Sequence, residues 1–138
     1  IKLPASLLFK PGSATIESQD TLLFLKRIAL IIDELPNEMR VSVQGHTDNQ
    51  NPGAKSIYKD NWELSSARAI SVLHELILDG VKPNRVSASG YAQYNPIATN
   101  ATDSGREKNR RVVLHFFGAK SDKSSDVETS VLDKIQDK

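Results

Sequence analysis

The sequence predicts an α/β sandwich in which helices cover one face of a β-sheet. Two long segments carry apolar residues at helical spacing, and shorter apolar segments precede and follow them. Proline, glycine and asparagine mark most of the junctions between these segments. The resulting order is β-α-β-α-β-(α)-β, and this alternation of strands and helices favours one sheet with helices packed on one face.

The first quarter of the chain predicts a short strand, a turn and a helix. Leu7-Leu8-Phe9 is apolar and precedes the turn signal Pro11-Gly12, so we expect a strand followed by a loop. A helix is expected over residues 18–35, because Ser18 is a plausible N-cap and Pro36 ends the segment. Its expected core face consists of Leu22, Leu25, Ile28, Ile31, Ile32 and Leu35.

The middle of the chain predicts a half-buried strand and a second long helix. Val41 and Val43 alternate with polar residues over residues 40–45, which is the pattern of a strand with one buried face. After a polar loop, a helix is expected from about Asn61 to Asp79, with Gly80 as its C-terminal cap. On a helical wheel the apolar face of this helix centres near Ile70, Leu73 and Ile77.

Two further strands are expected before the composition changes. Residues 86–91 predict one strand, and residues 111–117 predict another. The segment between them predicts a polar loop with a short helical piece over residues 106–109. The folded domain is therefore expected to span residues 1–117.

Residues 118–138 predict a polar tail. Residues 120–126 contain only Ser, Asp and Lys and suggest a disordered linker. The apolar residues that follow recur at helical spacing and predict a marginal amphipathic helix that needs a partner surface. These residues are Val127, Val131, Leu132 and Ile135.

Composition excludes several classes of function. The net charge is +1, from 18 basic and 17 acidic residues, so the chain lacks the excess of cations that nucleic-acid binding usually needs. The basic run at residues 104–111 contains Glu107 and no aromatic residue, and we interpret it as a solvated turn with local ion pairs. The absence of cysteine excludes disulfides and thiolate zinc sites. The chain begins at Ile1 without a methionine, so we expect a fragment, and any membrane anchor or export signal would lie upstream.

His46-Thr47-Asp48 lies where a predicted strand gives way to a loop, a common place for binding residues. A metal site would require more converging ligands than the three dispersed histidines suggest. A Ser-His-Asp hydrolase is compatible with the composition, but the Gly-x-Ser-x-Gly turn of such enzymes is missing. Taken alone, the motif favours a structural role in which Asp48 caps a turn through its own backbone. No cofactor is expected.

Arg68 has two interpretations. The wheel places it away from the predicted apolar face, beside Ser71 and Glu75, which indicates a solvated side chain. Its position early in the helix would also allow it to lean toward the preceding loop and face Asp48 across a shallow cleft. An arginine and an aspartate held apart in this way can bind the carboxylate and the ammonium of one zwitterion.

Five motifs, taken together and in this order, resemble the OmpA-like peptidoglycan-binding domain. They are Gly45-His46-Thr47-Asp48, Asn61-x-x-Leu64-Ser65-x-x-Arg68-Ala69, residues 86–91 (Val-Ser-Ala-Ser-Gly-Tyr), Asn95-Pro96-Ile97-Ala98 and Arg106-x-x-Asn109-Arg110-Arg111-Val112. The resemblance covers roughly residues 7 to 117 and implies a mixed sheet with the helices on one face.

The resemblance also implies a ligand and the residues that bind it. The ligand is the stem peptide of peptidoglycan, whose diaminopimelate carries an ammonium and a carboxylate on one carbon. The family's ligand-pairing aspartate falls on Asp48 and its arginine on Arg68. Its asparagine falls on Asn61, and Thr47 belongs to the same motif as Asp48. An enzyme acting on the cell wall is the alternative class, and it would require an activated nucleophile or a second carboxylate near the cleft.

Asn61-Trp62-Glu63-Leu64-Ser65 resembles the version of the domain in flagellar stator proteins, MotB and PomB, and the polar tail favours the sodium-driven PomB form. This implies a homodimer in the periplasm, a single transmembrane helix in the inner membrane, and a MotA- or PomA-like channel partner bound through the missing N-terminal region. The alternative within the family is a general envelope anchor, such as a Pal-like lipoprotein or the periplasmic domain of a porin.

The sequence allows more than one environment for three apolar residues. Trp62 is expected in the core, or else partly exposed beside the site where it would pack on glycan or peptide. Leu23 and Leu30 point the same way on the charged side of the first helix. They predict a dimer surface, or a surface that the tail covers, or simple exposure.

Overall fold

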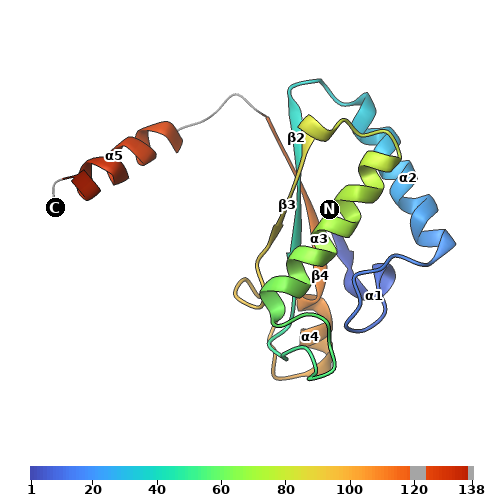
Figure 1. The fold of residues 1–138 in the computed structure, drawn as a ribbon. Coiled ribbons are helices and arrows are strands. Elements are labelled where there is room, and N and C mark those ends of the chain that lie inside the picture. Colours follow the sequence, from blue (N-terminus) through green and yellow to red (C-terminus); the bar gives the residue numbers. More distant parts are fainter. Residues whose placement is uncertain (119–123, 137–138) are drawn as a thin grey trace.

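The computed structural model describes residues 1–118 and 124–136. Its described residues form a four-stranded mixed sheet in the order β1-β4-β2-β3. The central strands β4 (Arg111–Gly118) and β2 (Met39–His46) are antiparallel, β1 (Lys2–Pro4) is antiparallel to β4, and β3 (Val86–Gly90) is parallel to β2. The helices α2 (Gln19–Glu34) and α3 (Asn61–Leu78) lie together on one face of the sheet (Figure 1). The predicted α/β sandwich with a mixed sheet is therefore confirmed.

The core lies between the sheet and these two helices. Alternation along β2 and β4 directs one set of apolar side chains toward the helices and leaves polar residues such as Ser42 and His115 on the open face. The helices contribute Leu25, Ile28 and Ile32 from α2, and Ala69, Val72 and Leu76 from α3. The strands contribute Val41, Val43, Val112 and Leu114.

Two glycines bring α3 unusually close to the sheet. A Cβ atom on Gly45 would lie 2.0 Å from the carbonyl oxygen of Ser65, and one on Gly90 would lie 2.2 Å from Ser66 Oγ. Only glycine permits such an approach between a strand and a helix backbone. The N-terminal half of α3 is thereby held against the C-terminal ends of the parallel strands β2 and β3, where the loops that follow these strands begin.

The face that α3 buries differs from the predicted one. Ile70 is exposed, and Leu73 and Ile77 are only partly buried, whereas Ser65, Arg68, Ala69 and Val72 are buried. The close approach to the sheet selects small residues for part of this contact, and Leu64 and Leu76 complete the buried face, which is therefore centred on other positions than predicted. Of the two interpretations of Arg68, the solvated one is wrong, because the carbonyl groups of Lys10 and Ser13 cover its side chain.

The predicted strand at Leu7-Leu8-Phe9 is also wrong. The strand at the N-terminus is β1, and α1 (Ala5–Leu8) follows it directly. Ala5 and Leu8 are buried while Leu7 is exposed, because one helical turn places positions three apart on the same face. A three-residue apolar run fits either element, and the pairing of β1 with β4 decides between them.

The remaining elements agree with the predicted ones within a few residues. The Ser18 hydroxyl caps α2 by accepting a hydrogen bond from the Thr21 amide. A 3-10 turn, η1 (Pro83–Arg85), precedes β3. The short helix α4 (Asp103–Asn109) begins three residues before the predicted start, because the Thr102 hydroxyl caps it by accepting from the Gly105 amide.

The tail contains the predicted helix, α5 (Ser124–Gln136). The predicted linker is wrong for residues 124–126, which are helical, and residues 120–123 lie outside the described residues. Val127, Val131, Leu132 and Ile135 are exposed, and so are Leu23 and Leu30. The tail therefore does not cover the leucine pair in this structure. None of the helices in residues 1–118 and 124–136 has the length and hydropathy to cross a membrane.

Candidate functional site

A cleft of about 670 Å³ lies where β2, α3 and the segment between α1 and α2 meet. All four residues that the family resemblance assigns to ligand binding line it, namely Thr47, Asp48, Asn61 and Arg68. Arg110 lines it as well, from the residue before β4. The cleft therefore combines one carboxylate with two guanidinium groups, brought together from three separate parts of the chain.

The Asp48 carboxylate is buried and fixed at both oxygens. Oδ1 accepts a hydrogen bond from the Gln50 amide at 2.9 Å, which is the backbone turn expected for an Asx residue. Oδ2 accepts from Nη1 of Arg110 at 2.5 Å. The turn-capping role and the cleft position thus coexist in one side chain, since one oxygen shapes the loop and the other faces the cationic partner.

Arg68 is 4% exposed and is held by carbonyl groups from a distant segment. Its Nε donates to the Ser13 carbonyl at 2.8 Å, and Nη2 lies 3.4 Å from the Lys10 carbonyl. The guanidinium also lies 5.1 Å from the centre of the Phe9 ring. Its Nη1 has no hydrogen-bond partner among the described residues, so this nitrogen is available to a ligand that enters the cleft.

Burial lowers the pKa of Arg68 from its usual value. The nearby charge of Arg110 lowers it further, while Tyr58 and Asp48 act in the opposite direction. An arginine stays protonated at neutral pH despite such shifts. Arg68 is therefore a permanent, partly desolvated cation, and it offers a carboxylate a stronger hydrogen bond than an exposed arginine does.

Asn61 and Thr47 shape the cleft by holding its backbone. Asn61 Nδ2 donates to the Gln50 carbonyl at 3.0 Å and lies 3.3 Å from the Asp48 carbonyl. The Thr47 hydroxyl donates to the Asp48 carbonyl at 2.8 Å, and the Thr47 amide donates to the Ala92 carbonyl. The Asn61 amide nitrogen and the Thr47 hydroxyl are therefore engaged with the loop that carries Asp48, which indicates a positioning role for both residues.

Sequence reasoning missed the role of Arg110. The basic run was expected to form local ion pairs, and Arg106 does pair with Asp103 within α4. Arg110, however, pairs with a carboxylate 62 residues away in the sequence. The available signal was its position directly before a strand, where extended backbone sends Arg110 and Arg111 to opposite sides.

The environment of His46 indicates a structural role for this residue. It is buried and stacks on Tyr91, with ring centroids 5.0 Å apart and planes 7° from parallel. Burial, and secondarily the charge of Arg111, lower the pKa of His46 to about 4, so the ring is neutral at physiological pH. His46 makes no hydrogen bond to Asp48 or to a serine in the described part of the chain, which removes the basis for a triad. Residues 1–118 and 124–136 contain no cluster of three His, Cys, Asp or Glu that could hold a metal ion.

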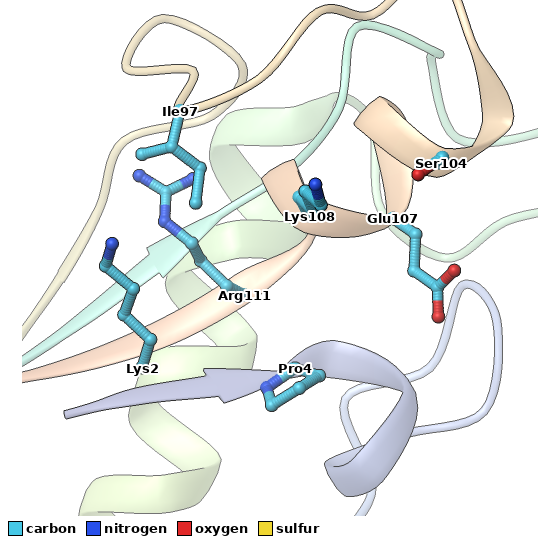
Figure 2. Close-up of a pocket in the computed structure, with 7 residues that line it drawn as sticks. All are labelled: Lys2, Pro4, Ile97, Ser104, Glu107, Lys108 and Arg111. Carbon is cyan, nitrogen blue, oxygen red and sulfur yellow. The ribbon is translucent and has the colours of Figure 1, made fainter.

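A second, smaller cavity of about 320 Å³ is lined by residues of β1, α4 and the start of β4 (Figure 2). Lys2 and Arg111 extend side by side along one wall, while Ser104, Glu107 and Lys108 come from α4. Arg111 donates to the carbonyls of Asn109 and Asn95, so it ties the loop before α4 to the sheet. This cavity contains none of the four predicted binding residues.

Trp62 is 49% exposed, so of its two predicted environments the core is wrong and partial exposure is confirmed. The residue before it, Asn61, is the one that turns inward to the cleft. Trp62 stacks instead on Tyr94, which is also exposed, with ring centroids 5.2 Å apart.

Leu23 and Leu30 are 51% and 57% exposed on α2. Phe24 and Ile31 lie beside them and are exposed too, although Ile31 was expected in the core. These four residues form the α2 apolar patch. Its role in a dimer stays a prediction.

Comparison with known proteins shows which family the chain belongs to. The family model described as the OmpA family matches residues 8–110. Motility protein B of Helicobacter pylori strain J99 is 41% identical over 134 residues, covering 97% of this chain and 51% of that protein. Motility protein B of Bacillus subtilis is 39% identical over 113 residues, covering 81% of this chain and 42% of that protein. The chain thus spans about half the length of these curated relatives.

Solved structures give the same result. The crystal structure of the periplasmic domain of Helicobacter pylori MotB has a TM-score of 0.80 and 40% identity, covering 97% of this chain and 90% of that one. The cell wall anchor of the T6SS from Pseudomonas aeruginosa has a TM-score of 0.76 and 34% identity, covering 86% of this chain and 80% of that one. On the extent of the family match and of these identities, the chain belongs to the OmpA family.

Proposed function

We propose that this chain is the non-covalent peptidoglycan-binding anchor of a flagellar stator B subunit, which holds the ion-driven stator to the cell wall while it generates torque. The observation that carries the proposal is the placement of Asp48 and Arg68 in one cleft. The two groups are buried, have opposite charge, and are anchored by different segments of the chain.

This arrangement suits the free end of diaminopimelate. The carboxylate of the ligand binds Arg68, whose Nη1 is available, and the ammonium binds the Asp48 carboxylate. Fixed, partly desolvated charges strengthen both interactions, because little reorganisation is needed when the ligand enters. Asn61 and Thr47 contribute by holding the Asp48 loop in place.

The same cleft favours binding over catalysis. Glycoside hydrolysis usually requires two carboxyl groups on either side of the scissile bond. Asp48 is the only acidic residue among those that line the cleft, and it is already hydrogen-bonded at both oxygens. We therefore assign the domain a binding role without enzymatic activity.

The stator assignment is favoured over a general envelope anchor by the extent of the match. Motility protein B of Helicobacter pylori aligns with 97% of the chain. Outer membrane porin F of Pseudomonas fluorescens is 42% identical but aligns with 64%, and the Escherichia coli protein named "Probable lipoprotein YiaD" aligns with 83% but is 35% identical. The proposal includes a periplasmic location, an inner-membrane helix and a MotA- or PomA-like channel partner in the full-length protein. The choice between a MotB and a PomB form stays open.

A homodimer is part of this proposal, with the α2 apolar patch as its contact. Four large apolar side chains on two adjacent stripes of one helix leave a surface that a symmetric copy can cover. The tail does not cover this surface, and α5 presents a separate apolar stripe of its own.

Co-sedimentation with purified peptidoglycan sacculi tests the proposed function. The wild-type chain should pellet with sacculi, and Asp48→Ala and Arg68→Ala should each abolish pelleting while the circular dichroism spectrum stays unchanged. Asp103→Asn is the matched control, because it removes an acidic partner of an arginine outside the cleft. Wild-type pelleting by both cleft variants would contradict the proposal. In cells, the same two variants should abolish motility and leave the filaments normal.

A further inference from the structure

An exposed pair of stacked aromatic rings lies beside the cleft. Trp62, in the first turn of α3, is 49% exposed, and Tyr94, in the loop after β3, is 62% exposed. Their ring centroids are 5.2 Å apart and their planes differ by 28°. We call this pair the aromatic platform. The rings shield part of each other, yet about half of each side chain remains in contact with solvent.

The residues that precede the two rings contact each other at the wall of the cleft. Trp62 follows Asn61, and Tyr94 follows Gln93. Asn61 Nδ2 lies 3.4 Å from Gln93 Oε1, and the same nitrogen holds the backbone of the loop that carries Asp48. The platform therefore borders the Asn61 wall of the cleft, so a polymer held at Asp48 and Arg68 would pass next to it.

The chemistry of the platform matches a sugar ring. Exposed Trp and Tyr rings offer a rigid apolar face with a polar edge, at low cost in conformational entropy. Pyranose rings present a face of C–H groups that packs on such a surface, while their hydroxyl and amide groups remain hydrated. Peptidoglycan contains both parts, since each stem peptide is attached to an amino-sugar chain.

We propose that Trp62 and Tyr94 bind the amino-sugar rings of the glycan strand while the cleft holds the stem peptide. This inference rests on the proposed function, because it places a second part of the same polymer next to the first. Phe117 offers a comparison within the chain. It is also an exposed aromatic stacked on a neighbour, His115, but it pairs with Arg40 at the other end of β2 from the cleft.

Trp62 is the single tryptophan of the chain, so its fluorescence reports on the platform directly. A peptide-free oligomer of N-acetylglucosamine should change the emission of the wild-type 138-residue chain in a saturable way. The response should be lost in Tyr94→Ala and retained in Asp48→Asn. If the wild-type emission does not respond to the oligomer, the proposal is overturned.

Binding to whole sacculi and binding to an isolated stem peptide distinguish the aromatic platform from the cleft. Trp62→Ala and Tyr94→Ala should each weaken pelleting with sacculi about three- to tenfold, the range expected for one aromatic contact. Their affinity for a diaminopimelate tripeptide, measured by calorimetry, should equal that of wild type. Phe117→Ala should match wild type in both assays.

Failure of this inference can be distinguished from failure of the proposed function. Two outcomes would overturn the sugar subsite and leave the cleft assignment intact, provided that Asp48→Asn fails to pellet. In the first, both platform variants pellet like wild type. In the second, they lose tripeptide affinity as much as they lose pelleting. If Asp48→Asn pellets like wild type, the assignment of the cleft as the peptide-binding site is overturned instead. The fluorescence response to the oligomer then still tests sugar binding by the aromatic platform.

Discussion

Arg110 and Asp48 form an ion pair across the cleft, with Nη1 of Arg110 2.5 Å from Oδ2 of Asp48. The Asp48 side chain is 7% exposed and that of Arg110 is 39% exposed. The carboxylate that the proposed ligand needs is therefore already paired when the cleft is empty. A ligand ammonium must share Oδ2 with Arg110 or displace it.

Competition for this oxygen predicts the behaviour of Arg110→Gln. A simple primary amine without a carboxylate should bind the variant about threefold more tightly than wild type, the factor that a partly exposed ion pair typically provides. Titration followed by NMR would measure this. Arg106→Gln, which removes a guanidinium paired outside the cleft, is the control and should leave the affinity unchanged. Weaker amine binding by Arg110→Gln would show that the two cations do not compete.

The variants Asp48→Asn and Arg68→Lys test whether ligand binding depends on the charge of Asp48 and on the guanidinium shape of Arg68. Asparagine can still accept the Gln50 amide, and lysine keeps a positive charge, so both variants should fold. Asp48→Asn should lose about thirtyfold or more in affinity for diaminopimelate, because the ligand ammonium is left without its charged counterpart. Arg68→Lys should also lose affinity, because an ammonium cannot make the bidentate contact of a guanidinium with a carboxylate. Calorimetry would measure the loss, and thermal unfolding would confirm the fold. Affinities within twofold of wild type would contradict the assignment of both residues.

Gly45→Ala should destabilise the domain and disturb the cleft together. The added methyl group would lie 2.0 Å from the Ser65 carbonyl oxygen, which forces α3 away from β2. Overpacking of this kind costs about 1–3 kcal/mol or more. Gly53→Ala is the control, since nothing lies within 4 Å of the position where its Cβ would be. Chemical denaturation would measure both variants, and equal stabilities would show that the contact between helix and strand is less tight than described.

His46 should make the fold sensitive to acid. The pKa of His46 falls from 6.5 to about 4 on folding, so the unfolded chain binds the extra proton more readily between these values. The stability supplied by the neutral ring is complete above about pH 6.5 and is lost as the pH falls toward 4, with an upper limit of about 3 kcal/mol.

His46→Phe tests this sign. The phenyl ring keeps the stacking on Tyr91 and cannot take up a proton, so the variant should lose most of the pH dependence between 6.5 and 4. His115→Phe is the control, because His115 is exposed on the open face of the sheet. Denaturation midpoints recorded across this range would decide, and an unchanged pH profile in His46→Phe would assign the acid sensitivity elsewhere.

The α2 apolar patch should mediate self-association. Leu23→Glu combined with Leu30→Glu should shift a dimer toward monomer in sedimentation velocity, because charged groups replace the two leucines at the centre of the contact. Peptidoglycan binding through Asp48 and Arg68 should be unaffected. Leu78→Glu changes a leucine that is 79% exposed on α3 and should leave the sedimentation profile as in wild type. A dimeric double variant would exclude this surface.

Local sequence alone determined most of the secondary structure. The cap at Ser18, the alternation of Val41 and Val43, and the apolar strand before Gly118 each depend on neighbours a few residues away. Such signals act through hydrogen bonds and burial patterns within one element, which is why α2, β2, α3 and β4 were predicted nearly to the residue. The resemblance of five short motifs then located Asp48 and Arg68 in one family site.

Tertiary structure alone decided which faces are buried and which charges meet. Arg68 lies on the polar side of its helical wheel, yet the carbonyl groups of Lys10 and Ser13 cover it, because that segment folds over the start of α3. Arg110 finds its partner 62 residues away, a distance over which periodicity carries no information. Trp62 is exposed in the first turn of α3 and stacks on Tyr94 from the loop after β3. Burial and pairing of this kind depend on where separate segments come together, and no local pattern of residues specifies that position.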